Sequence, residues 1–236
     1  MGKRLVRMAT VGMTLALVAC GQNTPHATIL YLRAREYGGA AFPARILVNR
    51  QFVRIDPDMA TGDYILFNRK QRVVYSVDAT DRTILVIHSH PVTYTSPMVL
   101  ANRIEKIPGV LTFDGHKAQH YVLSTNGKQC YSLYVAKGFL RGAAKALTDY
   151  DKALSGERAL AAEQGVPQPQ GPCELADGIF SAGREYTLGF PVKLTDKDHN
   201  EKILLRVRRN VAVGRDTFTL PAHYLRYSPN EVRNSG

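Results

Sequence analysis

Two histidines separated by a single residue are the first candidates for chemistry in this chain. His88 and His90 flank Ser89. Alternate residues of a β-strand point to one face, which would place their Cα atoms roughly 6–7 Å apart. Imidazole nitrogens at that separation suit zinc, which takes four ligands. His116 and His120 could add ligands, but no third ligand is signalled. We therefore favour surface histidines at a strand end, and expect neither a metal nor another cofactor.

The sequence lacks the common catalytic motifs. A serine hydrolase needs a nucleophile, a base and an orienting residue, and neither a G-x-S-x-G nor an S-x-x-K pattern occurs. No phosphate-binding loop or dinucleotide fingerprint is present either. Most acidic residues fall in turns, where solvent and turn geometry explain them. We therefore expect a non-enzymatic protein and keep a hydrolase only as a remote alternative.

The N-terminal segment carries the most specific signal. Three basic residues within 1–7 precede an uncharged run over 8–19. The run is shorter than the roughly 20 apolar residues of a membrane-spanning helix, and the layout is that of an export signal. It ends Leu17-Val18-Ala19-Cys20-Gly21, which resembles the lipobox of bacterial lipoproteins. The resemblance implies a signal peptide over 1–19, cleaved before Cys20. The alternative is an ordinary signal peptide with an incidental cysteine.

Lipidation of Cys20 would fix the location of the mature chain. In lipoproteins the cysteine carries a diacylglycerol thioether and its amine is acylated, as with palmitate. Two or more acyl chains hold a protein stably on a membrane, with residues 20–27 as a lipidated tether. Gly21 stands where an Asp would usually retain a lipoprotein in the inner membrane. The resemblance therefore implies the outer membrane of the cell envelope, on the periplasmic side.

Cys130 and Cys173 remain as a pair once Cys20 is lipidated. An even number of cysteines in an oxidising compartment predicts a disulfide bond. The bond would close a loop of 44 residues, and the chain-entropy model assigns such a loop about 4 kcal/mol. Two buried free thiols are the alternative.

The chain is basic, with a formal net charge of +11. Removing the three basic residues of the signal leaves 28 basic against 20 acidic residues, or +8. A basic cytoplasmic protein would suggest nucleic acid as a partner, but export argues against it. The basic run that includes Arg206 and Arg208 is most simply a solvated strand face. The alternative is that these arginines contact the anionic head group of a lipid.

Short segments rich in β-branched and aromatic residues, separated by turn residues, fill the first half of the mature chain. Even spacing of this kind is typical of an antiparallel sheet rather than of alternating strands and helices. Asn126-Gly127 between two of the segments predicts a tight hairpin, because both residues accept positive φ. The predicted strands are 28–37, 45–49, 52–56, 64–68, 72–78, 82–88, 110–113, 116–124 and 128–135.

The apolar period becomes helical after residue 138. The apolar spacing over 138–154 forms one helix face, and Asp151 is expected on or near the other side, with Lys145, Asp149 and Lys152. A further helical piece completes an insert over 138–164. Closing strands are predicted at 186–194, where Gly189 and Pro191 indicate an edge or a bulge, and at 202–213. In the last strand Ile203, Leu205 and the following valines alternate onto one face.

This plan resembles the half-barrel of the bacterial lipoprotein-carrier (LolA/LolB-type) group. The residues that suggest it are 45–56, 63–78, 189–193 and 216–221. The resemblance implies one α+β, mostly β domain over 28–227: a curved antiparallel sheet, open as a half-barrel, with the helical insert packed on its concave side. Residues 228–236 would be a flexible tail.

In those proteins the cavity between sheet and helices binds an acyl chain or another hydrophobic ligand. The implied function is a non-enzymatic cell-envelope lipoprotein that binds a hydrophobic or lipidic ligand and is held on the membrane by its lipid anchor. The alternative from another class is a protein–protein interaction or assembly module of an envelope complex. An envelope hydrolase stays the remote alternative, and nucleic acid is not expected as a partner.

Overall fold

The computed structural model describes residues 24–57, 61–166 and 171–234. The predicted signal peptide, the lipobox and Cys20 lie outside these residues. Within them, no helix is both long and apolar enough to cross a membrane.

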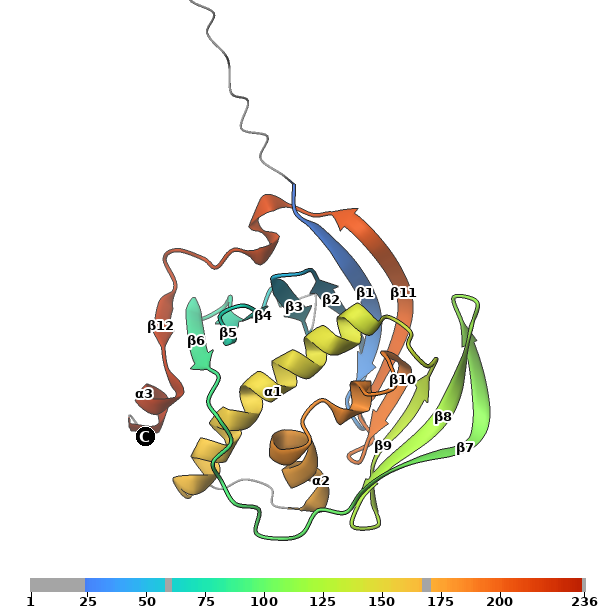
Figure 1. The fold of residues 1–236 in the computed structure, drawn as a ribbon. Coiled ribbons are helices and arrows are strands. Elements are labelled where there is room, and N and C mark those ends of the chain that lie inside the picture. The colour runs from blue at the N-terminus through green and yellow to red at the C-terminus, as the bar shows by residue number, and fades with distance from the viewer. Residues whose placement is uncertain (1–23, 58–60, 167–170, 235–236) are drawn as a thin grey trace, which may run out of the picture.

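The described chain is mostly β, built on one large open sheet with a few helices. The twelve strands follow the order β12-β6-β5-β4-β3-β2-β1-β11-β10-β9-β8-β7, and the sheet curves around the longest helix (Figure 1). Neighbours pair antiparallel except for β12 and β6, which are parallel. The strands are β1 (His26–Arg35), β2 (Ala41–Val48), β3 (Phe52–Asp56), β4 (Tyr64–Asn68), β5 (Val73–Asp78), β6 (Thr83–His88), β7 (Asn102–Phe113), β8 (His116–Thr125), β9 (Lys128–Val135), β10 (Pro191–Asp196), β11 (Glu201–Ala212) and β12 (Leu225–Tyr227).

The meander from β1 to β6 agrees closely with the sequence prediction. The predicted segments 52–56, 64–68 and 128–135 coincide with β3, β4 and β9. Asn126 and Gly127 both have positive φ and connect β8 to β9, as the hairpin prediction requires. The strand predicted at 186–194 is wrong in its first half, because Arg184–Tyr186 form a short helical turn, η2, and β10 begins at Pro191. A register shift after Pro191 supports the bulge rather than the edge.

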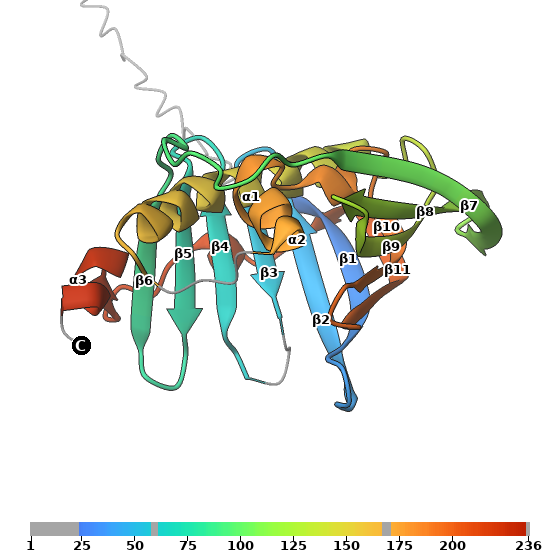
Figure 2. The same cartoon turned by 90° about the horizontal axis from the view of Figure 1, so that it is seen from below.

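One face of the sheet, here called the helix face, is covered by helices. It carries α1 (Arg141–Glu163), followed by α2 (Pro172–Leu175), the π-helical turn η1 (Ala176–Phe180) and η2. The helical region therefore extends well beyond the predicted 138–164. Figure 2 shows α1 and α2 lying along this side of the strands. Leu30, Val53 and Phe67 of the sheet form one core with Ala144 and Leu147 of α1.

The small residues of α1 allow other chain segments to approach it closely. A Cβ at Gly156 would overlap the backbone of His90, in the segment of residues 89–101 that passes across the helices from β6 to β7 (Figure 2). At the other end of the helix, Gly142 has open space around it. The helix is therefore packed between the sheet and this crossing segment.

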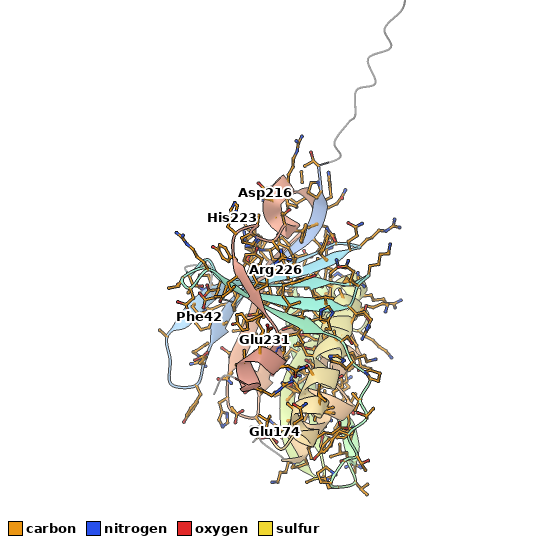
Figure 3. The ribbon with its side chains drawn as sticks, turned by 90° about the vertical axis from the view of Figure 1, so that its left-hand side faces the viewer. Phe42, Glu174, Asp216, His223, Arg226 and Glu231 are labelled. Atoms are coloured by element: carbon orange, nitrogen blue, oxygen red, sulfur yellow. A yellow bond between two sulfur atoms is a disulfide. The ribbon has the colours of Figure 1, made fainter. Side chains whose placement is uncertain are left out.

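The opposite face of the sheet, the outer face, is covered by the C-terminal segment. Phe218 stacks on Phe52 with ring centroids 5.6 Å apart, and Tyr64 donates a hydrogen bond to the carbonyl of Thr219. Arg54 donates to the carbonyl of Thr217 at 2.9 Å. Figure 3 shows Asp216, His223, Arg226 and Glu231 following one another along this segment. The segment closes a second apolar core, which contains no residue of α1 or α2.

The buried carboxylate of Asp56 organises this attachment. It accepts from Arg45 at 2.6 Å and from Arg54 at 2.8 Å, and the Arg54 guanidinium lies 3.7 Å from the ring centre of Tyr64. A buried carboxylate of this kind is stable because both cations and hydrogen bonds compensate its lost solvation.

The end of the chain differs from the predicted flexible tail. Pro229–Asn234 form a short helix, α3, and Arg233 makes an ion pair of 2.7 Å with Glu157 of α1. The C-terminal segment thereby passes from the outer face, along β12, to the helix side.

Two bulges interrupt β11 and change the faces of its residues. The register against β1 shifts twice, once between Tyr31 and Leu32 and once between Ala27 and Ile29. Leu204 is buried and Leu205 is 55% exposed. The predicted single apolar face with Ile203 and Leu205 is therefore wrong, because an extra residue in a strand reverses the alternation beyond it.

Candidate functional site

A cavity of about 620 Å³ lies between the helix face of the sheet and the helical region. Leu32, Ile46, Ile55 and Ile65 come from four adjacent strands and form its apolar wall. These side chains share one face of the sheet because strand residues alternate between faces. The remaining wall comes mainly from α1, from the α2–η2 region and from residues 190–202, with Tyr131 of β9 and Tyr94 of the crossing segment. The cavity therefore has an apolar side and a polar end.

Helix α1 presents Leu147, Tyr150, Asp151 and Arg158 to the cavity. Positions spaced by three or four residues share one side of a helix, so Asp151 lies on the same side as Leu147. The prediction that Asp151 lies on or near the side opposite the apolar face is wrong. Asp151 follows Leu147 by one helical turn, and the cavity lies between this side of α1 and the sheet, so the carboxyl is enclosed on the side of the helix that faces the sheet.

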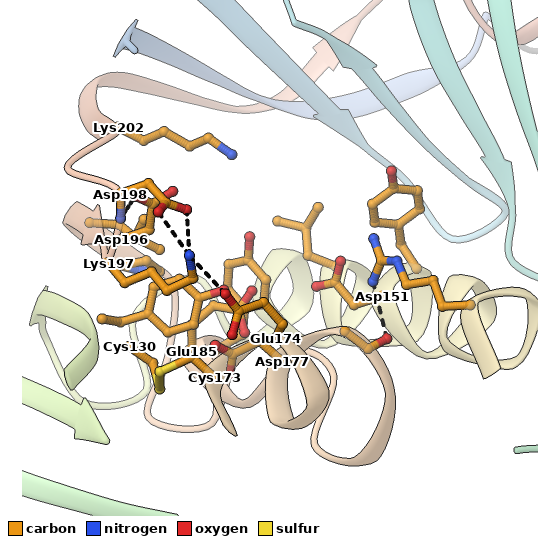
Figure 4. A pocket seen from close by; sticks show the side chains of 18 of the residues that line it. Cys130, Asp151, Cys173, Glu174, Asp177, Glu185, Asp196, Lys197, Asp198 and Lys202 are labelled. Carbon is orange, nitrogen blue, oxygen red and sulfur yellow. Dashed lines mark hydrogen bonds and ion pairs between the residues drawn. A yellow bond between two sulfur atoms is a disulfide. The ribbon is translucent and has the colours of Figure 1, made fainter. Parts of the chain in front are cut away.

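Most charges at the polar end of the cavity already have partners (Figure 4). Lys197 lies 2.9 Å from Glu174 and 2.8 Å from Asp198. Asp177 forms a 2.5 Å ion pair with Arg184. Asp196 accepts hydrogen bonds from the turn residues that follow it. These four carboxylates therefore stabilise the local fold of the cavity wall.

Asp151 and Glu185 differ from those carboxylates. Burial raises the pKa of Asp151 to about 6 against the opposing effect of Arg158. Burial, and then the charge of Asp151, raise the pKa of Glu185 to about 8. Glu185 is half-buried as a residue, yet its Oε2 atom is fully buried and has no hydrogen-bond partner among the described residues. Both side chains line the cavity.

Three tyrosines surround this pair. Tyr131, Tyr150 and Tyr186 line the cavity, and burial raises the pKa of each phenol, that of Tyr150 to about 12. Phenols with raised pKa values stay protonated at neutral pH and can donate hydrogen bonds. The polar end thus offers neutral donors beside acidic groups.

The predicted disulfide is confirmed and lies in the cavity wall. Cys130 of β9 and Cys173 of α2 are bonded, with their Cα atoms 5.4 Å apart. Both residues are buried. The bond fixes the first turn of α2 to the sheet, and so positions the chain that carries Glu174, Asp177 and Glu185.

The histidines singled out by the sequence lie in different surroundings. His88 ends β6, and His90 approaches Glu157 to 3.9 Å. His120 bonds to Ser132 at 2.8 Å, while the His116 ring lies against Phe139. In the part of the chain that the structure describes, no group of three or more His, Cys, Asp or Glu side chains could hold a metal ion.

Arg206 and Arg208 lie away from the cavity. The Arg206 guanidinium lies 4.3 Å from the ring centre of Tyr31, whose side chain packs with the outer-face cluster of Ile29 and Leu47. Arg208 pairs with Ile29 in the ladder. The cations that line the cavity are instead Arg158, Lys197 and Lys202, which no motif in the sequence indicated.

Comparison with known proteins gives distant structural matches. No family model and no curated protein sequence matches this chain. An uncharacterized conserved protein from Thermus thermophilus aligns with a TM-score of 0.44 and 10% identity, covering 86% of this chain and 90% of that one. Two crystal forms of PNGF-II align with a TM-score of 0.43 and 8% and 10% identity, and this chain spans about a third of their length. Similarity at this level carries no argument about function.

Proposed function

We propose that this chain is a non-enzymatic lipoprotein of the cell envelope that binds an amphipathic, lipidic ligand in the cavity between its sheet and its helices. The observation that carries the proposal is the cavity itself, whose wall of Leu32, Ile46, Ile55 and Ile65 faces a polar end. Small-molecule sites are typically 300–1,000 Å³ and mostly apolar, with a few polar groups that orient the ligand. A volume of about 620 Å³ falls within that range.

The curved sheet with helices over one face supports a half-barrel of the lipoprotein-carrier type, in which the sheet would hold the ligand and α1 with α2 would act as the lid. The Cys130–Cys173 bond also supports export, because disulfides persist in oxidising compartments. Lipidation of Cys20 would then hold the domain at the periplasmic side of the outer membrane. This reading leaves Arg206 and Arg208 free to approach anionic lipid at the surface rather than inside the cavity.

Native mass spectrometry of the protein lacking residues 1–20, followed by organic extraction, tests the binding function. We expect a bound lipid in stoichiometric amount. Ala162→Trp, which places a large side chain in the cavity wall, should abolish the bound mass. Ala40→Trp in the exposed turn before β2 is the matched control and should retain it. An empty protein in repeated preparations, with no uptake of added amphiphile, would contradict the proposal.

One observation favours an envelope assembly module as the second candidate. β7 is a long edge strand, and almost all of its residues are exposed. Among them Ile104, Val110 and Leu111 are each at least 40% exposed. Unpaired edge strands can accept a strand from another chain. Site-specific crosslinking from position 111 of β7 in cells tests this candidate. A specific crosslinked partner should appear, and Ile104→Lys on the same strand should remove it.

A further inference from the structure

The charge at the polar end of the cavity is opposite to that of the whole protein. The chain carries a net charge of +11, yet six carboxylates and three cations line the cavity. The carboxylates are Asp151, Glu174, Asp177, Glu185, Asp196 and Asp198. The basic composition of the chain does not explain a local excess of acidic side chains. This excess makes the polar end of the cavity attractive to positive charge.

Ion pairs and hydrogen bonds within the site already hold four of the six carboxylates, which leaves two of them for a ligand. Glu174, Asp177, Asp196 and Asp198 are held by Lys197, Arg184 or turn amides, as described above. Arg158 donates to the carbonyl of Gly178 at 3.2 Å, and its charge opposes the rise in the pKa of Asp151. Lys202 lines the cavity, but no hydrogen bond or ion pair joins it to Asp151 or Glu185 among the described residues. These two carboxyls are therefore the acidic groups at which a ligand can still be held.

The unpartnered oxygen of Glu185 points to a ligand. A buried polar atom without a hydrogen bond is costly, and native proteins rarely leave one without a reason. The Oε2 atom of Glu185 is such an atom and lies in the cavity wall. A donor from a bound molecule would satisfy it. Because no third carboxyl, histidine or cysteine joins the pair as a metal-binding group in the described chain, an organic cation fits the site better than a metal ion.

We propose that the cavity selects amphiphiles that carry a cationic nitrogen, with the apolar chain against Ile46, Ile55 and Ile65 and the ammonium group held between Asp151 and Glu185. The proposal rests on the proposed function, because it names the ligand class for the same cavity. An anionic amphiphile such as a fatty acid would place its carboxylate against the same acidic pair and should bind more weakly.

Binding of a cation should be coupled to loss of a proton. Since the pKa of Glu185 is raised to about 8, this carboxyl is mostly protonated at neutral pH. A bound ammonium group favours the ionised form, so binding expels the proton and affinity rises with pH through this range. The charged and titratable groups that face Glu185 are Asp151 from α1, Asp177 from η1, Lys202 from β11, Tyr131 from β9 and the adjacent Tyr186.

Competition binding on the protein from residue 21 onward tests the proposal. The neutral dye N-phenyl-1-naphthylamine reports cavity occupancy, and dodecylamine, dodecanol and dodecanoate compete with it. At about pH 8.5 we expect dodecylamine to bind about tenfold more tightly than dodecanol, which is the range of one hydrogen bond to a charged group, and dodecanoate to bind more weakly than either. The preference for the amine should shrink at about pH 6, and calorimetry in two buffers should show proton release.

Glu185→Gln should reduce the ratio of dodecylamine affinity to dodecanol affinity toward one. Glu105→Gln on the exposed strand β7 is the matched control and should bind like the wild type. If Glu185→Gln does not fold, Asp151→Asn and the pH dependence of the wild-type protein carry the test. Binding of dodecanol with no preference for the amine would overturn the proposed ligand class alone. Failure of every amphiphile to displace or bind would overturn the cavity function, and this inference with it.

Discussion

Replacing Glu185 by glutamine tests the buried carboxyl without any ligand. Burial and the nearby charge of Asp151 raise the pKa of Glu185 from 4.5 to about 8. The folded protein therefore holds a proton that the unfolded chain has already released, at every pH between these values. By linkage, the free energy of unfolding falls as pH rises through this interval. Stability linked to this group is fully present below about pH 4.5 and lost above about pH 8.

The size of the stability loss follows from the interval between the ordinary and the raised pKa of Glu185. One pKa unit corresponds to about 1.4 kcal/mol, so the wild-type protein should lose on the order of 4 kcal/mol between about pH 4.5 and pH 8 through this residue. Glutamine cannot ionise, so Glu185→Gln removes this dependence. We therefore expect the variant to match the wild type within about 1 kcal/mol at pH 5, and to exceed it by several kcal/mol at pH 9.

Urea denaturation of both proteins at the two pH values measures the effect. The chain has no tryptophan, so far-ultraviolet circular dichroism is the suitable signal. Other groups titrate over this range, seven histidines among them, and the difference between variant and wild type cancels their contribution. For the control Glu105→Gln, the difference from the wild type in free energy of unfolding should be the same at both pH values. The reasoning would be refuted if Glu185→Gln differed from the wild type in free energy of unfolding by the same amount at pH 5 and pH 9, or if the variant were less stable than the wild type at pH 9.

Three further changes test the structural elements that hold the cavity. Replacing Cys130 and Cys173 by serine should lower the free energy of unfolding in urea by about 4 kcal/mol, and a loss below about 1 kcal/mol would contradict the role given to the bond. Gly156→Ala should destabilise the protein by about 1–3 kcal/mol through overpacking against the crossing segment. Gly142→Ala, in open space on the same helix, should stabilise it by up to about 1 kcal/mol. Equal effects of the two variants in thermal melting would exclude the close contact at Gly156. Asp56→Asn should cost about 3 kcal/mol, because two arginines lose their charged partner, and faster proteolysis of the C-terminal segment should accompany the loss.

The strand meander could be predicted because its segments are short and locally determined. In β3 and β4 the alternation of side chains and the flanking turn residues are visible within a few positions of the sequence. The first half of β7 could not be predicted, since Pro97 and Pro108 indicate irregular chain and most of this strand is exposed. The register shift between Ile107 and Val110 accommodates Pro108 at the edge of the sheet.

The residues of the cavity could not be predicted in the same way. Asp151 has a helical position compatible with either solvent or interior, and the cavity that it lines with Glu185 and Lys202 decides between them. Glu185 lies in η2, a turn whose sequence has no periodic signal. The face of Leu205 depends on a bulge in β11. In each case the deciding contact joins segments far apart in the sequence, and such contacts leave no local pattern.

The disulfide connects the predicted compartment to the proposed ligand site. Cys173 holds α2 against β9, and the chain continues from α2 through η1 and η2 to Glu185. Asp151 belongs to α1, whose position depends instead on its apolar contacts with the sheet. The two carboxyls are therefore brought together by different constraints, one covalent and one hydrophobic. Without the disulfide, the α2–η2 region would keep its apolar contacts with α1 and the crossing segment and the hydrogen bonds of Arg184 to Asn102 and Ser124 of the sheet. An oxidising environment adds the covalent link to these contacts and so favours the arrangement in which both carboxyls face the cavity.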